Sequence, residues 1–297
     1  MTLKIQNLSK TYSNGTKALS DVSLEIPKGM FGLLGPNGAG KSSLMRTIAT
    51  LQEPDSGTIF LDDLDVLKQK DEVRKVLGYL PQEFGVYPKV SAEMLLDHIA
   101  ILKGISNRKE RKELVGALLN KTNLWDARKK NLGGYSGGMK QRFGIAQALI
   151  SNPQLIIVDE PTAGLDPAER NRFLNLLSEL GENTVVILST HIVEDVKELC
   201  TSMAIINQGQ VLLTGNPIES IDAIQGKVWK KHVSKEELED HKARYHVISD
   251  RLIAGKPEIH VFSESQPDAS FESIQADLED VYFSQIVPVS TQEPALV

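Results

Sequence analysis

The stretch Gly35-Pro36-Asn37-Gly38-Ala39-Gly40-Lys41-Ser42-Ser43 decides the fold of this chain. It fits the pattern Gly-x-x-x-x-Gly-Lys-[Ser/Thr] of a phosphate-binding loop. The apolar run 30–34 before it predicts a buried strand, and residues 44–51 after it carry apolar side chains at helical spacing. Strand, glycine loop and helix in this order are the context that the motif requires.

The residue types of this loop suit a polyphosphate. Gly35, Gly38 and Gly40 let the backbone adopt positive φ and approach a ligand closely. Successive N–H groups and the N-terminal end of the following helix then attract an anion. Lys41 adds an ammonium group for the β- and γ-phosphates, and the Ser42 hydroxyl is a hard oxygen ligand for Mg²⁺. The sequence therefore predicts a nucleoside triphosphate site with Mg²⁺ rather than a turn that only caps a helix.

The composition sets limits on the class of protein. The 297 residues carry 33 Lys and Arg against 39 Asp and Glu, a net charge of −6, so no overall basic field favours nucleic acid. The only cysteine, Cys200, excludes an intrachain disulfide and lies on an expected helix face, which predicts a packed thiol. The first residues form no signal-peptide pattern, and apolar runs such as 155–158 are far shorter than the roughly 20 residues that span a bilayer. We therefore expect a soluble chain whose membrane part, if any, belongs to another subunit.

The segments on either side of the loop predict an antiparallel β-subdomain. Residues 3–8 and 21–26 read as strands separated by a turn signal at 13–16, and the second strand alternates apolar and polar residues. Residues 54–65 predict a further strand between two turns. Tyr12 ends the first strand, where its ring could stack on an adenine base or simply pack.

A mostly helical region is expected after a strand at 76–80. In the loop after that strand, Gln82 could orient water or Mg²⁺ through its carbonyl oxygen, or it could be a solvated glutamine. Residues 92–102 and 108–121 repeat apolar side chains at three- and four-residue spacing, which predicts two helices. The expected face of the first helix carries Met94, Leu95, His98, Ile99 and Leu102.

A second glycine segment, Ser136-Gly137-Gly138, stands at the start of a helix that extends to about residue 150. A serine followed by free N–H groups at a helix start predicts a second anion site. Farther along, Asp166 and Pro167 begin an expected helix at 168–180, and residues 203–214 predict a hairpin.

Two carboxylates follow the apolar run 155–158, which predicts a strand buried on both faces. Successive residues of an extended chain point in opposite directions, so Asp159 and Glu160 need not share a role. Asp159 suits the Mg²⁺ shell, and Glu160 suits a general base that polarises the attacking water. His191 follows the buried strand expected at 184–189, where it is placed for contact with a γ-phosphate.

Residues 218–297 predict a small α+β appendage with a loose tail from about residue 288. Its expected elements are strands at 227–233, 244–249 and 258–263, a capping box at 234–237 that opens a short helix, and a helix over 270–286. Four histidines read as surface or strand residues without carboxylate or cysteine partners at metal spacing. These are His232, His241, His246 and His260.

The order of these motifs resembles the nucleotide-binding subunit of an ATP-binding cassette (ABC) transporter. The resemblance covers about residues 2–217 and rests on Tyr12, the loop 35–43, Gln82, Ser136-Gly137-Gly138, Asp159-Glu160, Asp166 and His191. It implies an α/β fold, namely a P-loop NTPase core with a mixed sheet, an antiparallel β-subdomain and a helical subdomain at about 83–150. The cassette would occupy residues 1–217, and the small C-terminal α+β appendage and tail would occupy residues 218–297.

The resemblance also implies roles for single residues. Tyr12 would stack on adenine, and the loop residues Gly35, Pro36, Asn37, Gly38, Ala39, Gly40, Lys41, Ser42 and Ser43 would hold the phosphates of ATP. Ser42, Gln82 and Asp159 would hold Mg²⁺ and its waters. Glu160 would act on the lytic water and His191 would contact the γ-phosphate, so that the catalytic set is Glu160, His191, Gln82 and Lys41. Ser136, Gly137 and Gly138 would reach the ATP that a second copy binds.

The expected partners are a second ATP-binding subunit, which is a second copy or a close homologue, and a separate transmembrane permease, with no nucleic acid. The permease would hold the chain in the cytoplasm at the inner face of the plasma membrane, and the loop with Phe84 and Tyr87 is the expected contact. The end of the appendage, residues 278–283, resembles cassettes of bacterial export-type transporters. Tyr135 and Met139 depart from the usual leucine and glutamine of the family's signature segment.

Two other classes of protein stay open at this point. A non-transport cassette acting in translation or DNA repair would usually carry two cassettes or long coiled coils, neither of which the sequence shows. A catalytically silent nucleotide binder is disfavoured because Lys41, Asp159, Glu160 and His191 are all present.

Overall fold

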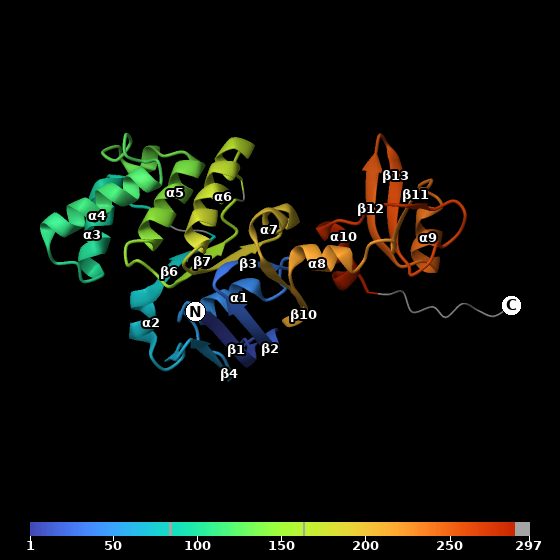
Figure 1. The fold of residues 1–297 in the computed structure, drawn as a ribbon, viewed down its shortest axis with the longest axis horizontal. Helices are drawn as coiled ribbons and strands as arrows, with labels where there is room; N and C mark the ends of the chain where they lie inside the picture. The colour runs from blue at the N-terminus through green and yellow to red at the C-terminus, as the bar shows by residue number, and fades with distance from the viewer. Residues whose placement is uncertain (83–84, 163, 289–297) are drawn as a thin grey trace.

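The computed structural model describes residues 1–82, 85–162 and 164–288. Figure 1 shows an elongated molecule in which helices and a central sheet form one end and a small β-rich appendage forms the other. Among the described residues, no helix has the length and apolar character needed to cross a bilayer.

The central sheet consists, in spatial order, of β10 (Gln210–Gly215), β9 (Ser202–Asn207), β3 (Gly29–Leu34), β8 (Val185–Thr190), β7 (Leu155–Asp159) and β6 (Leu77–Leu80). All neighbours are parallel except β10, which runs antiparallel to β9. The strands β7 and β8 are buried along their whole length, as their apolar runs predict. This confirms the mixed sheet of the expected α/β fold.

Helices cover both faces of this sheet. On one face lies α1 (Lys41–Ile48), whose Leu44 and Met45 share a core cluster with Ile157, and α2 (Lys70–Val76) packs there through Val73. On the other face lie α6 (Pro167–Gly181) and α7 (Val193–Leu199), in a cluster with Ile156 and Val158. Alternate residues of β7 thus enter two separate layers. The sequence pattern does not predict α2.

A second sheet confirms the antiparallel β-subdomain. Its strands are β2 (Lys17–Pro27), β1 (Thr2–Thr11), β4 (Ser56–Leu61) and β5 (Leu64–Asp65), in that spatial order and all antiparallel. In β2, Val22, Leu24 and Ile26 are buried and the residues between them are exposed. The apolar face packs on α1 in the same core cluster as the central sheet.

The helical subdomain has a core of its own. It contains α3 (Ala92–Leu102), α4 (Arg108–Lys121), the 3-10 turn η1 (Leu132–Gly134) and α5 (Gly137–Ala148). The predicted bounds of α3 and α4 are confirmed. Of the predicted face of α3, Leu95 and Ile99 do pack on the core, but the other three residues do not. Met94 and Leu102 are 66% and 72% exposed, and His98 is exposed as well, whereas Ala92, Leu96 and Ala100 are buried. Because α4 and α5 pack against one side of α3 only, the second apolar stripe stays at the surface.

The appendage is a four-stranded antiparallel sheet joined to the rest of the chain by helices. Its strands, in spatial order, are β12 (Val247–Ile253), β13 (Lys256–Phe262), β11 (Val228–His232) and β14 (Glu272–Ser273), and its helices are α8 (Pro217–Asp222), α9 (Leu238–Arg244) and α10 (Leu278–Ile286). Figure 1 shows α8 and α10 between the two ends of the molecule. Val281 and Tyr282 of α10 share a core cluster with Val196 of α7, so this helix packs against α7 as well as against the appendage.

Three expectations for the appendage are wrong in their bounds. The helix predicted over 270–286 begins only at Leu278, because Asp277 caps it in a capping box with Asp280, while Phe271 is buried in a separate core with Ile259. The strand predicted at 244–249 begins at Val247, since α9 extends to Arg244. The capping-box contacts between Ser234 and Glu237 are present, but they close a turn before α9 instead of opening the helix. The strands predicted at 227–233 and 258–263 are confirmed as β11 and β13.

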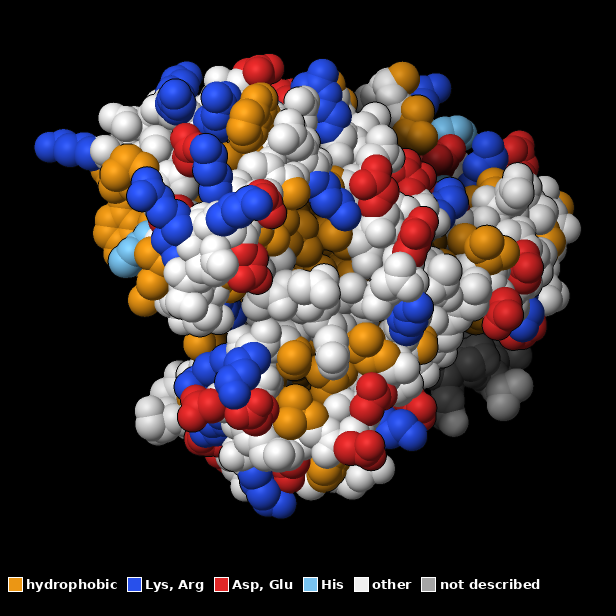
Figure 2. All heavy atoms as spheres, turned by 60° about the vertical axis from the view of Figure 1, so that its left-hand side comes forward, with side chains coloured by type: hydrophobic (Ala, Val, Ile, Leu, Met, Phe, Trp, Pro, Cys, Tyr) orange, Lys and Arg blue, Asp and Glu red, His pale blue; other side chains and the backbone are white. Residues whose placement is uncertain are grey.

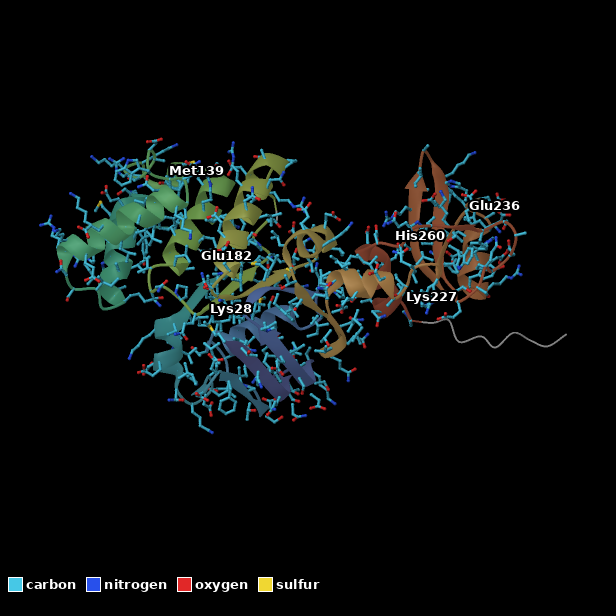
Figure 3. All side chains as sticks on the ribbon, viewed as in Figure 1. Lys28, Met139, Glu182, Lys227, Glu236 and His260 are labelled. Atoms are coloured by element: carbon cyan, nitrogen blue, oxygen red, sulfur yellow. The ribbon has the colours of Figure 1, made fainter. Side chains whose placement is uncertain are left out.

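Two of the four appendage histidines lie on strands and contact carboxylates. His260 Nδ1 lies 2.8 Å from Asp280 Oδ1, and His232 Nε2 lies 3.4 Å from Glu258 Oε2 (Figure 3 labels His260). These contacts join β13 to α10 and β11 to β13, which sequence spacing does not reveal. No metal cluster results, because the described residues hold no group of three His, Cys, Asp or Glu side chains suited to a metal ion.

Candidate functional site

The phosphate loop joins β3 to α1, and close packing requires two of its glycines. A Cβ at Gly35 would lie 2.3 Å from the Ile206 carbonyl oxygen, and one at Gly40 would lie 2.4 Å from the carbonyl oxygen of Ala18. Gly40 also has a φ of 109°, a left-handed conformation that glycine adopts without strain. No side chain caps α1 at Gly40, so the first N–H groups of the helix are available to an anion.

Lys41 lies across this loop and is 5% exposed. Its Nζ donates hydrogen bonds to the carbonyl oxygens of Gly35 and Pro36, and it lies 4.0 Å from Glu160 Oε1. Burial lowers the pKa of Lys41, whereas the carboxylates of Glu160 and Asp159 raise it. The two acids therefore offset part of the cost of burying an ammonium group at the loop.

Asp159 ends β7 and is buried. Burial raises the pKa of its carboxyl group, the hydroxyls of Ser189 and Ser42 and the charge of Lys41 lower it, and the neighbouring Glu160 raises it further. A carboxylate beside a hydroxyl is the donor set of a hard cation such as Mg²⁺. Because no third carboxylate, histidine or cysteine joins them among the described residues, a cation here would complete its shell with amide, phosphate and water oxygens. The residues present thus fit Mg²⁺ bound together with a nucleotide.

Glu160, the next residue, contacts a different set of groups. Its Oε2 lies 3.2 Å from His191 Nδ1 and 3.3 Å from Gln82 Nε2. Its backbone has a φ of 46°, a conformation that costs free energy in any residue other than glycine. The Glu160 N–H donates to the Ser189 carbonyl oxygen of β8 at 2.8 Å, which holds the turn in place. The two adjacent acids therefore have separate environments, one towards Ser42 and one towards His191.

One cavity of about 270 Å³ brings most of the predicted site residues together. Tyr12 borders it, with its hydroxyl oxygen 2.9 Å from Ser43 Oγ and 3.1 Å from Gln52 Oε1. These contacts fix the ring beside the phosphate loop; stacking on adenine stays a prediction. The cavity is lined by Tyr12, Thr16, Ala18, residues 36–43, Gln82 and Glu160.

The segment Ser136-Gly137-Gly138 lies outside this cavity. Its serine caps α5 by accepting a hydrogen bond from the backbone N–H of Met139, and Ser136 and Gly137 are exposed. The two unusual neighbours serve the helical subdomain itself. Tyr135 is buried with its hydroxyl donating to the Ala127 carbonyl oxygen at 2.9 Å, and Met139, labelled in Figure 3, packs against the subdomain core.

A buried ion pair beside the site was not predicted. Asp195 of α7 is 0% exposed and accepts hydrogen bonds from Thr162 Oγ1 and Arg170 Nε, both at 2.7 Å. Thr162 follows Glu160 by two residues, and α7 begins two residues after His191, so Asp195 ties the segments behind both side chains together. No motif marks these residues, because the contacts join positions 33 and 25 residues apart.

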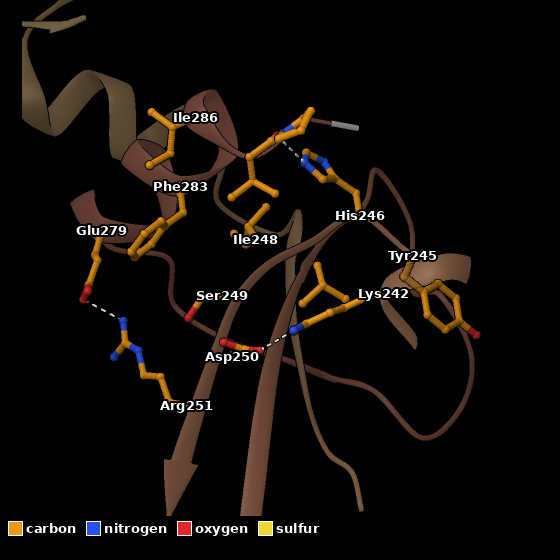
Figure 4. A pocket seen from close by; sticks show the side chains of 13 residues that line it. Lys242, Tyr245, His246, Ile248, Ser249, Asp250, Arg251, Glu279, Phe283 and Ile286 are labelled. Atoms are coloured by element: carbon orange, nitrogen blue, oxygen red, sulfur yellow. Dashed lines mark hydrogen bonds and ion pairs between the residues drawn. The ribbon is translucent and has the colours of Figure 1, made fainter. Parts of the chain in front are cut away.

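A larger cavity, of about 680 Å³, lies in the appendage between β12 and α10 (Figure 4). Its charged side chains are already paired, Lys242 with Asp250 at 2.7 Å and Arg251 with Glu279 at 2.6 Å. It contains no glycine loop and no uncapped helix start, so the smaller cavity at residues 36–43 is the better candidate for a phosphate ligand.

Known proteins resemble this chain over nearly its whole length. The sequence profile of the family described as ABC transporter matches residues 19–163. The uncharacterized ABC transporter ATP-binding protein YxlF of Bacillus subtilis is 34% identical over 300 residues, which cover 96% of this chain and 99% of that protein. The chain belongs to the ABC transporter ATP-binding proteins. Two further relatives are NatA of B. subtilis, 41% identical over 67% of this chain and 82% of NatA, and the daunorubicin/doxorubicin resistance protein DrrA of Streptomyces peucetius, 33% identical over 90% of this chain and 79% of DrrA.

Solved ABC cassettes share the fold. The dimeric post-hydrolysis cassette MJ0796 bound to ADP and Pi is 27% identical with a TM-score of 0.66, and the match covers 72% of this chain and 98% of MJ0796. A second ATP-binding subunit of an ABC transporter has a TM-score of 0.67 at 28% identity, over 75% of this chain and 93% of that chain. This ABC cassette is therefore an ATPase that uses ATP and Mg²⁺ as the ATP-binding subunit of a transporter. Such subunits work as dimers together with a transmembrane permease. The assignment to translation or DNA repair is not supported.

Proposed function

We propose that this chain hydrolyses ATP at the loop 35–43 and couples hydrolysis to export through a separate membrane permease. The observation that carries the catalytic part is the convergence of Lys41, Glu160 and His191. Glu160 Oε1 lies 4.0 Å from Lys41 Nζ, and Oε2 of the same carboxylate lies 3.2 Å from His191 Nδ1. A base, a cation and an imidazole at one glycine loop are what phosphoryl transfer to water needs.

The catalytic residues would divide the chemistry between them. Lys41 and the N–H groups of the loop would bind the β- and γ-phosphates and neutralise charge that develops there. Glu160 would accept the proton of the attacking water, and Gln82 would help to orient that water. His191 would hold the Glu160 carboxylate and contact the γ-phosphate.

Ser42 and Asp159 are the proposed protein ligands of Mg²⁺, with the carbonyl oxygen of Gln82 as a third. Gln82 Nε2 donates to Glu160, so its carbonyl oxygen is the group left to accept or ligate. When bound, the ion would neutralise charge on the phosphates of ATP. Asp159 is suited to this task because burial disfavours its charged form, and a nearby cation would stabilise that form.

A second ATP-binding subunit would complete each site. Ser136 and Gly137 are exposed at the start of α5 and lie outside the cavity of their own chain. We therefore assign Ser136, Gly137 and Gly138 to the γ-phosphate of the nucleotide on the other subunit. In a homodimer the same two surfaces would meet twice about a two-fold axis.

The permease is proposed to dock on an apolar groove at the start of α3. The groove has a volume of about 600 Å³, and its exposed rim includes Tyr87, Met94 and Ile101, which are 67%, 66% and 46% exposed. Figure 2 shows hydrophobic side chains together on this side of the molecule. Exposed apolar surfaces of this kind are typical of contacts with another protein or a membrane, which supports the proposal. The other expected contact, Phe84, lies outside the described residues. The chain would thereby be held at the inner face of the plasma membrane.

Export is proposed as the direction of transport. The name of DrrA states resistance to daunorubicin and doxorubicin, and its similarity covers 90% of this chain and so extends beyond the cassette into the appendage. We also assign the cassette to residues 1–217, with its helical subdomain at about 83–150, and the appendage with its tail to 218–297.

Recovery of the permease tests this function. A tagged chain solubilised from membranes is expected to co-purify with a protein of several membrane spans, and Met94→Glu is expected to abolish that recovery. Leu252→Glu is the matched control, because Leu252 is 67% exposed but lies on the appendage. Recovery of ribosomes in place of a membrane protein, or equal recovery with both variants, would contradict the proposal.

A further inference from the structure

The helical subdomain is basic although the whole chain is acidic. Residues 85–142 contain 12 Lys and Arg against 5 Asp and Glu, a net charge of +7 in a chain whose total is −6. The residues outside 85–142 therefore carry a net charge of −13. Figure 2 shows many Lys and Arg side chains in the upper part of the molecule on the left, next to a hydrophobic patch, whereas both signs are mixed lower down. Such a separation of charge sets up a local field that the whole-chain charge conceals.

One of these bases contacts an exposed aromatic ring, and three others lie next to it in the chain or on the segment that is hydrogen-bonded to it. We call Lys89, Arg128, Lys129 and Lys130, together with Trp125, the basic rim. Trp125 is 39% exposed, and the guanidinium carbon of Arg128 lies 3.9 Å from the centre of its ring. Within the described chain, no acid forms an ion pair with any of the four bases. Several exposed bases elsewhere do lie beside an acid, as Lys75 lies beside Glu72 at 2.7 Å.

Backbone hydrogen bonds hold the basic rim against the proposed permease groove. The N–H groups of Leu132 and Gly133 donate to the carbonyl oxygens of Val90 and Pro88, at 3.0 and 3.1 Å, on either side of Lys89. The Glu93 N–H donates to the Arg128 carbonyl oxygen at 3.1 Å. Val90 lines the groove itself. A permease that occupied the groove would therefore bring the basic rim towards the membrane in which the permease lies.

We propose that the basic rim binds the anionic headgroups of the cytoplasmic leaflet beside the permease. Lys and Arg close to an anionic membrane surface are attracted to it, and tryptophan favours the boundary between headgroups and hydrocarbon. The inference rests on the proposed function only for the position of the permease. Nucleic acid fits less well, because the rest of the chain is strongly acidic and would repel it.

Vesicle flotation of the full chain tests this proposal. Wild type is expected to float with vesicles of phosphatidylcholine and about one third phosphatidylglycerol, not with phosphatidylcholine alone, and to float less as salt screens the attraction. The rim variant is Lys89→Glu with Arg128→Glu and Lys129→Glu. It leaves out Lys130, whose side chain lies over Gly134 next to the Ser136 segment. Three lost attractions predict that vesicle affinity falls by about tenfold or more.

A matched control carries the same change of charge elsewhere. Lys4→Glu with Lys68→Glu and Lys75→Glu alters three exposed bases of the β-subdomain and its neighbouring helix, and it is expected to float like wild type. Equal losses in both triple variants, or binding of the wild type to duplex DNA but not to vesicles, would overturn the proposal. Thermal unfolding of each variant confirms that it is folded.

The permease pull-down in detergent separates the two proposals. The rim variant is expected to recover the permease as wild type does, because the groove is unchanged. If the rim variant lost the permease in detergent, the basic rim would contact protein and the lipid assignment would be wrong. If wild type floated with anionic vesicles but recovered no permease, the proposed function would fail and the lipid contact would stand.

Discussion

The Nδ1 atom of His191 lies 3.2 Å from Oε2 of Glu160, at a point where the backbone of Glu160 takes a φ of 46°. A left-handed residue other than glycine costs on the order of 1 kcal/mol or more, and it persists only where its surroundings impose it. Here the bond from Glu160 N–H to the Ser189 carbonyl oxygen imposes it. The strained turn carries the carboxylate to the edge of the phosphate loop, where both His191 and Lys41 are within reach.

Glu160→Gln removes the proposed base while keeping the shape of the side chain. We expect kcat for ATP hydrolysis to fall by about 10²- to 10⁴-fold, because the amide cannot accept the proton of the attacking water. ATP affinity should be kept or improved, because a negative charge near the phosphates is lost. Phosphate release and equilibrium nucleotide binding measure the two effects, and near wild-type turnover in this variant would reject Glu160 as the base.

Asp159→Asn should stabilise the nucleotide-free protein while reducing hydrolysis. Burial raises the pKa of Asp159 above its ordinary value of 3.8, so the folded state binds a proton more readily than the unfolded chain. The charged carboxylate therefore lowers stability at pH values above the raised pKa, and this cost disappears as the pH falls below 3.8. We expect Tm to rise by about 2 °C or more at neutral pH and the gain to shrink towards about pH 4. A lower Tm at neutral pH would contradict this reading of the site.

Asp195→Asn tests the ion pair behind the site. Asparagine keeps an acceptor for Thr162 but loses the charge that pairs with Arg170, which leaves a partly buried guanidinium without its partner. We expect kcat to fall about tenfold with little change in KM for ATP, because the segments behind Glu160 and His191 lose their common support. Steady-state kinetics on folded protein decide the matter. The control is Arg172→Ala, which removes an exposed ion pair with Glu169 and should leave kcat within about twofold.

The thiol of Cys200 should be inert in the folded protein. It is buried, and burial raises its pKa to about 12, so almost no thiolate forms near neutral pH. Iodoacetamide is expected to label it only after denaturation, and N-ethylmaleimide should not reduce ATP hydrolysis. Mass spectrometry of the labelled protein measures the extent of reaction. Rapid labelling of the native chain would show that α7 opens in solution.

The cassette was predictable because its signals are local. A strand such as 155–158 and a helix such as α4 are encoded by runs of apolar residues with one period, and the structure confirms them within a few residues. The loop 35–43 is one contiguous motif, so its position between strand and helix followed from the sequence alone. The contacts of the site were harder to predict. Those of Glu160 join three segments that are distant in sequence, and they depend on a positive φ at a residue type that does not favour it.

The appendage shows where local signals fail. Phe271 and Ile274 continue the helical spacing of Leu278 and Val281, yet Phe271 belongs to the core under β11 and β13, and Asp277 begins the helix instead. The apolar spacing of residues 270–277 therefore did not predict their conformation. Burial against a sheet that is distant in sequence determined it instead. The exposed face of α3 is a similar case. Its apolar residues have the spacing of core residues, and only the packing of α4 and α5 shows which apolar stripe is exposed to solvent.

A crystal structure of the Glu160→Gln variant grown with Mg²⁺ and ATP tests the central claim most directly. We predict that the triphosphate lies on the N–H groups of residues 36–43 with Lys41 at its β- and γ-phosphates, and that Ser136 and Gly137 of a second subunit close the site. A nucleotide bound elsewhere, with residues 35–43 free of phosphate, would contradict it.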